Sequence, residues 1–171
     1  QEFKQASHVL QQCTALETWQ GPEDDWMLDE PEDCLEALEQ LHALGDAVVL
    51  AWPEGEKMRV TAPVTANNLS LKIASKGEWF NLDGKVTVDA DTVLSLRQLL
   101  ALSEHATGRF IAMGDGQFLS LSRQFQKKLQ ALNAYAETSG KEGLKIGSLA
   151  GLALDDLVND AGELKTDKRW K

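Results

Sequence analysis

The sequence predicts an α+β fold: two consecutive β-hairpin-plus-helix units form antiparallel sheet with helices packed on it, preceded by two acidic helices. Two Asp-Gly pairs, Asp83-Gly84 and Asp115-Gly116, stand between apolar runs, and Asp-Gly supplies the positive-φ residues of a tight hairpin turn. A segment with helical apolar spacing follows each pair. The 171 residues are 43% hydrophobic and 26% charged, which suits a domain that buries its core without disulfides.

An acidic helical segment is expected over residues 1–46. Residues 3–19 place apolar side chains at helical spacing, and Gly21-Pro22 then breaks that helix. A second helix is expected to begin near Pro31, because proline and the acidic residues after it suit a first turn. Its apolar stripe is Leu35, Leu38 and Leu41. Gly45 is placed to end it.

An α+β domain with the two hairpin-helix units is expected over residues 47–140. The apolar run at 47–52 and the segment 58–61 are its first expected strands. Apolar residues that alternate with polar ones predict the next strand: Leu69, Leu71 and Ile73. Residues 79–88 are then expected to form a hairpin about Asp83-Gly84.

A helix is expected to follow each hairpin. Asp91 can cap the first, over residues 92–104. Its inward residues are Val93, Leu96, Leu99 and Leu100. The second hairpin, over residues 109–121, leads into a helix that Ser122 can cap. The inward residues of that helix are Phe125, Leu129, Leu132 and Ala136.

Residues 141–171 are expected to form a C-terminal helical extension. Residues 144–146 predict a short strand, and Ser148 can cap a helix over 149–159. Its inward residues are Leu149, Leu152, Ala153 and Leu157. The charged stretch 163–171 is expected to begin a connection to further sequence, because a chain without an initiator methionine or signal peptide resembles a piece of a longer polypeptide.

Charge divides the sequence. Residues 5–56 contain thirteen acidic residues and no Lys or Arg, a formal charge of −13. The rest carries +3, because the whole chain sums to −10. Such an acidic stretch repels phosphate and is a poor nucleic-acid binder. Two interpretations stay open for it: a solvated face that aids solubility, or a surface that docks on a basic partner.

No catalytic, cofactor-binding or metal-ligating residue is assigned from the sequence. The glycine-lysine pairs at 84–85 and 140–141 lack the spacing of a phosphate-binding loop, and the three histidines are isolated. Cys13 and Cys34 are expected to be buried reduced thiols. The five tryptophans are interpreted as core residues, because only Lys76 near Trp79-Phe80 and Arg123 near Phe125 come close to the interleaved basic and aromatic residues of a stacking platform. No apolar run is long enough to span a membrane.

Four segments together resemble a known family. They are residues 44–57, residues 75–84, residues 108–121 with Gly108-Arg109-Phe110-Ile111 and Gly114-Asp115-Gly116-Gln117-Phe118, and residues 160–171. In order and spacing they resemble the accessory region N-terminal to the ATPase core of bacterial SWI/SNF-family helicases. The resemblance covers most of residues 28–171.

The resemblance implies a parent protein that is an ATP-driven, double-stranded-DNA-dependent translocase. ATP and Mg would then be cofactors of the missing core rather than of these residues, and the DNA would be bound by the parent. The expected partners of this region are its own ATPase core or another protein, with no membrane and no small molecule. The implied location is the bacterial cytoplasm, associated with the nucleoid through the parent.

Three functions are weighed. The first is a non-catalytic accessory module that positions or restrains the core, with the −13 stretch competing with DNA. The second is a nucleic-acid-binding module that uses the weakly basic residues 57–171. Its candidate basic face is Arg97, Arg109, Arg123, Lys127, Lys128, Lys141 and Lys145. The third is a hydrolase using carboxylates, for which no placed acid-base pair is found.

Overall fold

The computed structural model describes residues 8, 11–17, 26–55, 57–139 and 143–167. Their contacts group the chain into two compact units. Unit 1 comprises residues 1–62 and 107–120, and unit 2 comprises residues 63–106 and 121–171. The three-part division at 46 and 140 remains a prediction about domains.

Among the described residues, unit 1 contains the helix α2 and a three-stranded sheet. Its elements are α2 (Pro31–Ala43), β1 (Arg59–Val60), β5 (Phe110–Gly114) and β6 (Gln117–Ser120). The strand order is β1-β6-β5, with β1 parallel and β5 antiparallel to β6. Leu35, Val60 and Phe110 form its apolar core. The predicted helix start at Pro31 is confirmed, as is its end at Gly45, which has a φ of 56°.

The predicted second hairpin is also confirmed. Asp115 and Gly116 join β5 to β6 with φ values of 50° and 70°, the left-handed pair that a two-residue turn requires. Glycine is needed at the second position for another reason. A Cβ on Gly116 would lie 2.3 Å from the backbone oxygen of Lys57.

Two predictions for the N-terminal third are wrong. The described part of the first expected helix, residues 11–17, forms turns and a short 3-10 segment at Thr14–Leu16. Residue 8 is helical, and the remainder of the expected helix lies outside the described residues. The apolar run at 47–52 forms no strand, and Val49 is 90% exposed. Apolar composition alone does not provide the neighbouring strand whose backbone groups a β-strand needs.

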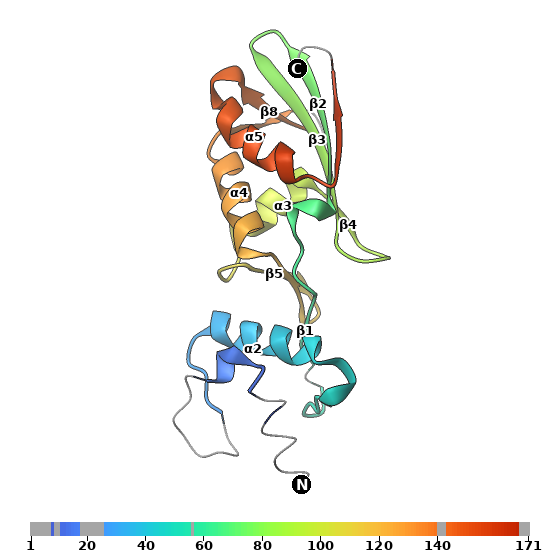
Figure 1. The fold of residues 1–171 in the computed structure, drawn as a ribbon, viewed down its shortest axis with the longest axis vertical. Coiled ribbons are helices and arrows are strands. Elements are labelled where there is room, and N and C mark those ends of the chain that lie inside the picture. The colour runs from blue at the N-terminus through green and yellow to red at the C-terminus, as the bar shows by residue number, and fades with distance from the viewer. Residues whose placement is uncertain (1–7, 9–10, 18–25, 56, 140–142, 168–171) are drawn as a thin grey trace. The chain divides into compact units, whose positions relative to one another are not determined.

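Unit 2 is a six-stranded sheet with helices on one side (Figure 1). Its strands are β2 (Leu69–Lys76), β3 (Trp79–Thr87), β4 (Val93–Ser95), β7 (Ala136–Ser139), β8 (Gly143–Gly147) and β9 (Glu163–Thr166). Its helices are α3 (Leu96–Ser103), α4 (Arg123–Asn133) and α5 (Gly151–Asp160). The strand order is β7-β8-β3-β2-β9, and β4 also pairs with β3. All pairs are antiparallel except β2 with β9.

The predicted hairpin about Asp83-Gly84 is wrong, because residues 79–87 form one continuous strand and the hairpin is formed by β2 with β3. β2 turns into β3 after Lys76, where Gly77 has a φ of 65°. Asp83-Gly84 lies inside the continuous strand β3. Gly84 is there because of close packing, since a Cβ at this position would lie 2.9 Å from the Cβ of Leu96 in α3.

The two helices after the hairpins are confirmed with one changed cap. Ser122 caps α4 as predicted, accepting a hydrogen bond from the Phe125 amide at 3.2 Å. Ser95, rather than Asp91, caps α3 through the Gln98 amide at 3.1 Å. The predicted inward leucines of α3 and the apolar residues of α4 are buried: Leu96, Leu99, Leu100, Phe125, Leu129 and Leu132. The other two inward predictions are wrong: Val93 is in β4 and 54% exposed, and Ala136 is in β7.

The C-terminal part contains more strand than predicted. β8 and α5 are confirmed, with Leu157 buried, but Ser148 makes no side-chain cap. The side chains of the other inward residues predicted for this helix lie outside the described ones. The expected connection at residue 163 is instead β9, which pairs in parallel with β2.

The α+β class is confirmed, with helices packed against largely antiparallel sheets. The order of hairpin then helix occurs twice along the chain, although the two hairpins belong to different sheets. In the part of the chain that the structure describes, no helix is both long and apolar enough to cross a membrane.

Candidate functional site

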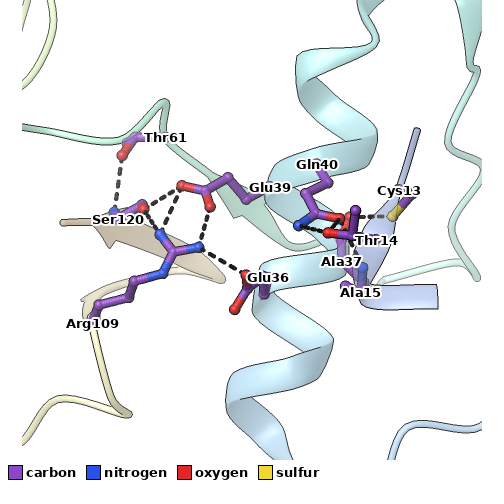
Figure 2. Close-up of polar contacts among 10 residues, drawn as sticks. All are labelled: Cys13, Thr14, Ala15, Glu36, Ala37, Glu39, Gln40, Thr61, Arg109 and Ser120. Atoms are coloured by element: carbon purple, nitrogen blue, oxygen red, sulfur yellow. Dashed lines mark hydrogen bonds and ion pairs between the residues drawn. The ribbon is translucent and has the colours of Figure 1, made fainter. Parts of the chain in front are cut away.

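Two polar features are candidates for function, one in each unit. In unit 1, α2 and the β5–β6 hairpin enclose a buried ion pair between Glu39 and Arg109 (Figure 2). Both residues are more than nine-tenths buried, with 8% and 6% of their surfaces exposed. In unit 2, the face of the sheet opposite the helices is open and carries lysines and a tryptophan.

The buried ion pair is bidentate. The two Nη atoms of Arg109 donate to the two carboxylate oxygens of Glu39, one of them at 3.1 Å. Ser120 is fully buried beside them, accepting from Nη1 at 2.7 Å and donating its hydroxyl proton to Glu39. The Ser120 amide donates to the hydroxyl of Thr61 at 3.0 Å. The planar guanidinium suits this forked geometry, so the Nη groups of Arg109, the Glu39 carboxylate and the Ser120 hydroxyl satisfy one another.

An acidic stripe of α2 faces this arginine. Glu36 Oε1 lies 3.9 Å from Arg109 Nη2, and Glu32 lies against Gly108. A Cβ on Gly108 would lie 2.1 Å from the carboxyl carbon of Glu32, so a side chain here would require that carboxylate to move. Helical spacing of i, i+4 and i+7 puts Glu32, Glu36 and Glu39 on one face of α2.

This cluster holds α2 to the hairpin. Both carboxylate oxygens of Glu39 are engaged, and the Ser120 hydroxyl both donates and accepts. A hydroxyl whose proton is donated to a carboxylate held by arginine is positioned rather than activated as a nucleophile. The arrangement is therefore that of a structural clamp.

Sequence reasoning missed the clamp and assigned Arg109 to a basic surface. That assignment is wrong, because a guanidinium that is 6% exposed and paired with Glu39 cannot reach a phosphate outside. A usable signal was present. Arg109 directly precedes the apolar pair Phe110-Ile111, and α2 carries three glutamates on one face.

The open face of unit 2 follows from strand alternation. In β2 and β3 the residues that point to the helices are almost fully buried, including Leu71, Leu82 and Val86. Their neighbours point the other way. The principal residues of this open face are Ser70, Lys72, Lys76, Trp79, Asn81, Asp83, Lys85 and Lys145. Because directly paired residues share a face, the registers place them side by side on one surface.

Trp79 lies on this face and is 40% exposed. It pairs with Gly147 across β3 and β8, and a Cβ on that glycine would lie 3.8 Å from the indole ring. The ammonium of Lys145 lies 4.7 Å from the ring centroid, within cation–π range, and 2.8 Å from Glu137. The core interpretation of the tryptophans is wrong for Trp79 and for Trp26, which is 38% exposed.

A shallow cavity of about 300 Å³ lies on the open face next to Trp79's strand. Its polar lining residues are Lys72, Asn81, Asp83 and Ser139. At the far edge of the sheet, Glu163 pairs with Lys165 at 2.9 Å and accepts from Ser70 at 2.8 Å. These hydrogen bonds, first from Lys165 and then from Ser70, lower the pKa of the Glu163 carboxyl.

The predicted basic face does not form one surface. Arg97 is on α3, and Arg123, Lys127 and Lys128 are on α4, all in the layer that covers the buried side of the sheet. Lys145 is on the opposite, open face. Lys128 is also engaged by Asp160. Lys141 lies outside the described residues.

The comparisons add no relative. No protein-family model matches the sequence, and no curated protein or solved structure matches it either. In the described part of the chain, no group of three His, Cys, Asp or Glu side chains is placed to hold a metal ion.

Proposed function

We propose that this chain is a non-catalytic accessory module of a bacterial SWI/SNF-type, DNA-dependent ATPase. Its role would be to position or restrain the ATPase core or to bind a protein partner. The proposal is supported by the structural roles of the segments that resemble the SWI/SNF accessory region. They supply the buried Arg109 of the clamp, the Asp115-Gly116 turn and the close-packed Gly84. Residues whose role is to stabilise the fold suit a module that holds other parts in place. An enzyme, in contrast, needs reactive groups that a substrate can reach.

The acidic stretch suggests how restraint would work. Its charge would compete with DNA for the positive surface of the core, where ATP and Mg would also be bound. Part of that charge is used inside unit 1, since Glu36 and Glu39 face Arg109. Asp29, Glu30 and Asp33 are exposed acidic side chains at the N-terminal end of α2. These three would supply the negative charge that competes with DNA.

The test measures basal and DNA-stimulated ATP hydrolysis by the parent protein. Three forms are compared: intact, lacking this region, and carrying Asp29→Asn, Glu30→Gln and Asp33→Asn together. We expect deletion and neutralisation both to lower the DNA concentration that half-maximally stimulates ATP hydrolysis at low salt. The difference from the intact protein should shrink as salt screens the charges. Asp155→Asn with Asp156→Asn on α5 is the matched control, because both residues are exposed and acidic but belong to unit 2.

Two results would count against the proposal. The first is a parent whose DNA dependence and salt sensitivity are the same with and without this region. The second is measurable ATP turnover by the purified chain itself after contaminating ATPases are removed. A control variant that acts as strongly as the α2 variant would show that net charge, rather than this surface, is responsible.

A further inference from the structure

The open face of unit 2 has the make-up of a stacking surface. It presents the aromatic side chain of Trp79 among polar and basic neighbours, whereas the opposite face is buried under helices. In the part of the chain that the structure describes, this side of β2 and β3 has its lysines exposed. Burying these ammonium groups would be costly unless each were paired with an opposite charge. The face is therefore suited to contact with water or with a charged ligand.

Trp79 is placed for contact with a flat ligand. Its cross-strand neighbour Gly147 has no side chain, so the indole lies close to the sheet and keeps 40% of its surface exposed. Lys145 brings a positive charge to the ring at 4.7 Å. Glu137 holds that lysine at 2.8 Å, which fixes the charge beside the ring. An aromatic ring next to a fixed cation suits a base that stacks and a phosphate that follows it.

The lysines extend this surface along the sheet. Lys72, Lys76 and Lys85 are exposed on the same face as Trp79. Among the described residues, none of the three takes part in an ion pair. The distance along β3 from Trp79 to Lys85 is about 20 Å at the usual rise per residue. That length accommodates several nucleotides.

The positive charge and the exposed tryptophan of the open face together indicate which class of ligand it binds. Asp83 is the one exposed carboxylate among the three lysines, and Glu137 and Glu163 are each paired with a lysine. The surplus of positive charge attracts a polyanion. A duplex keeps its bases stacked on each other, so only an unpaired strand can offer a base to Trp79.

We propose that the open face of unit 2 binds single-stranded nucleic acid, with a base stacked on Trp79 and phosphates held by Lys72, Lys76 and Lys85. This deepens the alternative of a nucleic-acid-binding module. It does not depend on the accessory role, since it concerns this chain alone.

The test is fluorescence anisotropy of a labelled 15-nucleotide oligothymidine titrated with the full chain at low salt. Trp79→Ala is expected to weaken binding about five- to 150-fold, which corresponds to the loss of one stacked base. Trp79→Phe is expected to retain most of the affinity. Trp26→Ala is the matched control, because Trp26 is equally exposed at 38% but lies in unit 1.

A second series tests the lysines independently of the tryptophan. The triple variant Lys72→Ala, Lys76→Ala and Lys85→Ala is expected to reduce the slope of log affinity against log salt by about 2. Lys127→Ala, an exposed lysine on α4, is expected to leave the slope nearly unchanged. Thermal unfolding of each variant confirms that a loss of binding is not a loss of folding.

Several outcomes would overturn the proposal. One is equal weakening by Trp79→Ala and Trp26→Ala, and another is a salt slope that the triple variant does not change. Tighter binding to a duplex of the same length would refute the stacked base. Binding to polyglutamate as tight as to oligothymidine would point to an acidic protein partner instead. These results leave the ATPase experiment on the parent untouched, so the two proposals fail separately.

Discussion

Removing the arginine of the clamp is expected to have a large effect on stability. The change Arg109→Ala leaves Glu39, 8% exposed, with a buried carboxylate that has lost its cation. Ser120, fully buried, loses the donor that lies 2.7 Å from its hydroxyl. Breaking a buried ion pair by removing one partner costs about 3–5 kcal/mol, because the remaining charge stays desolvated. The free energy of unfolding of unit 1 is expected to fall by that amount.

The assay is urea denaturation followed by circular dichroism, combined with hydrogen exchange of the backbone amides. Exchange is needed because the chain has two units, and it locates the loss in residues 107–120 and in α2. Lys165→Ala is the matched control. It removes an ion pair of similar length, 2.9 Å, whose side chains are 70% and 56% exposed. Exposed pairs contribute at most about 1 kcal/mol.

A third variant separates the loss of the pair from the cost of the stranded charge. Glu39→Leu, Arg109→Met and Ser120→Ala together replace the buried polar groups with apolar ones of similar size. This variant is expected to recover most of the stability lost in Arg109→Ala, because no buried charge is left unpaired. The reasoning would be refuted if Arg109→Ala cost no more than Lys165→Ala. It would also be refuted if the triple variant were the least stable of the three.

Three further predictions concern glycines and cysteines. Gly84→Ala is expected to cost about 1–3 kcal/mol in thermal unfolding, because its Cβ would meet the facing leucine of α3 at 2.9 Å. Gly116→Ala is expected to destabilise more than Gly55→Ala in the same measurement: both have positive φ, but only Gly116 has a backbone oxygen 2.3 Å from the added Cβ. Cys13 is expected to react with iodoacetamide more slowly than Cys34 at pH 8, because burial raises the pKa of the Cys13 thiol and keeps it protonated; equal rates for the two single-cysteine variants would contradict this.

Local signals predicted much of the fold. Alternation placed β2, and helical spacing placed α3 and α4, because one buried face imposes its period on the sequence. The Asp115-Gly116 turn was predictable because only residues tolerant of positive φ fit there. The same dipeptide at Asp83-Gly84 serves close packing instead. The local sequence does not distinguish the two uses, since the second depends on a helix that arrives later in the chain.

Features that need a distant partner were not predictable. β9 is a strand because β2 offers it an edge about ninety residues earlier in the chain, as shown by the pairing of Ser70 with Glu163. Its own sequence is charged and carries little β signal. The apolar run at 47–52 shows the opposite case, in which a strand-like sequence forms no strand. Its Val49 has no neighbouring strand and is 90% exposed.

The two candidate sites could not be predicted, because the sequence does not show whether a basic residue is buried or exposed. Sequence alone grouped Arg109 and Lys145 as basic residues, but one is buried against Glu39 and the other lies beside an exposed tryptophan. A guanidinium can be buried when a carboxylate matches its fork, whereas a lysine keeps its ammonium in water. An arginine directly before an apolar strand therefore indicates an internal clamp, and a lysine at alternate strand positions indicates an open face. By that rule, Lys72, Lys76 and Lys85 mark the open face of the unit 2 sheet as a surface whose charge a ligand can reach.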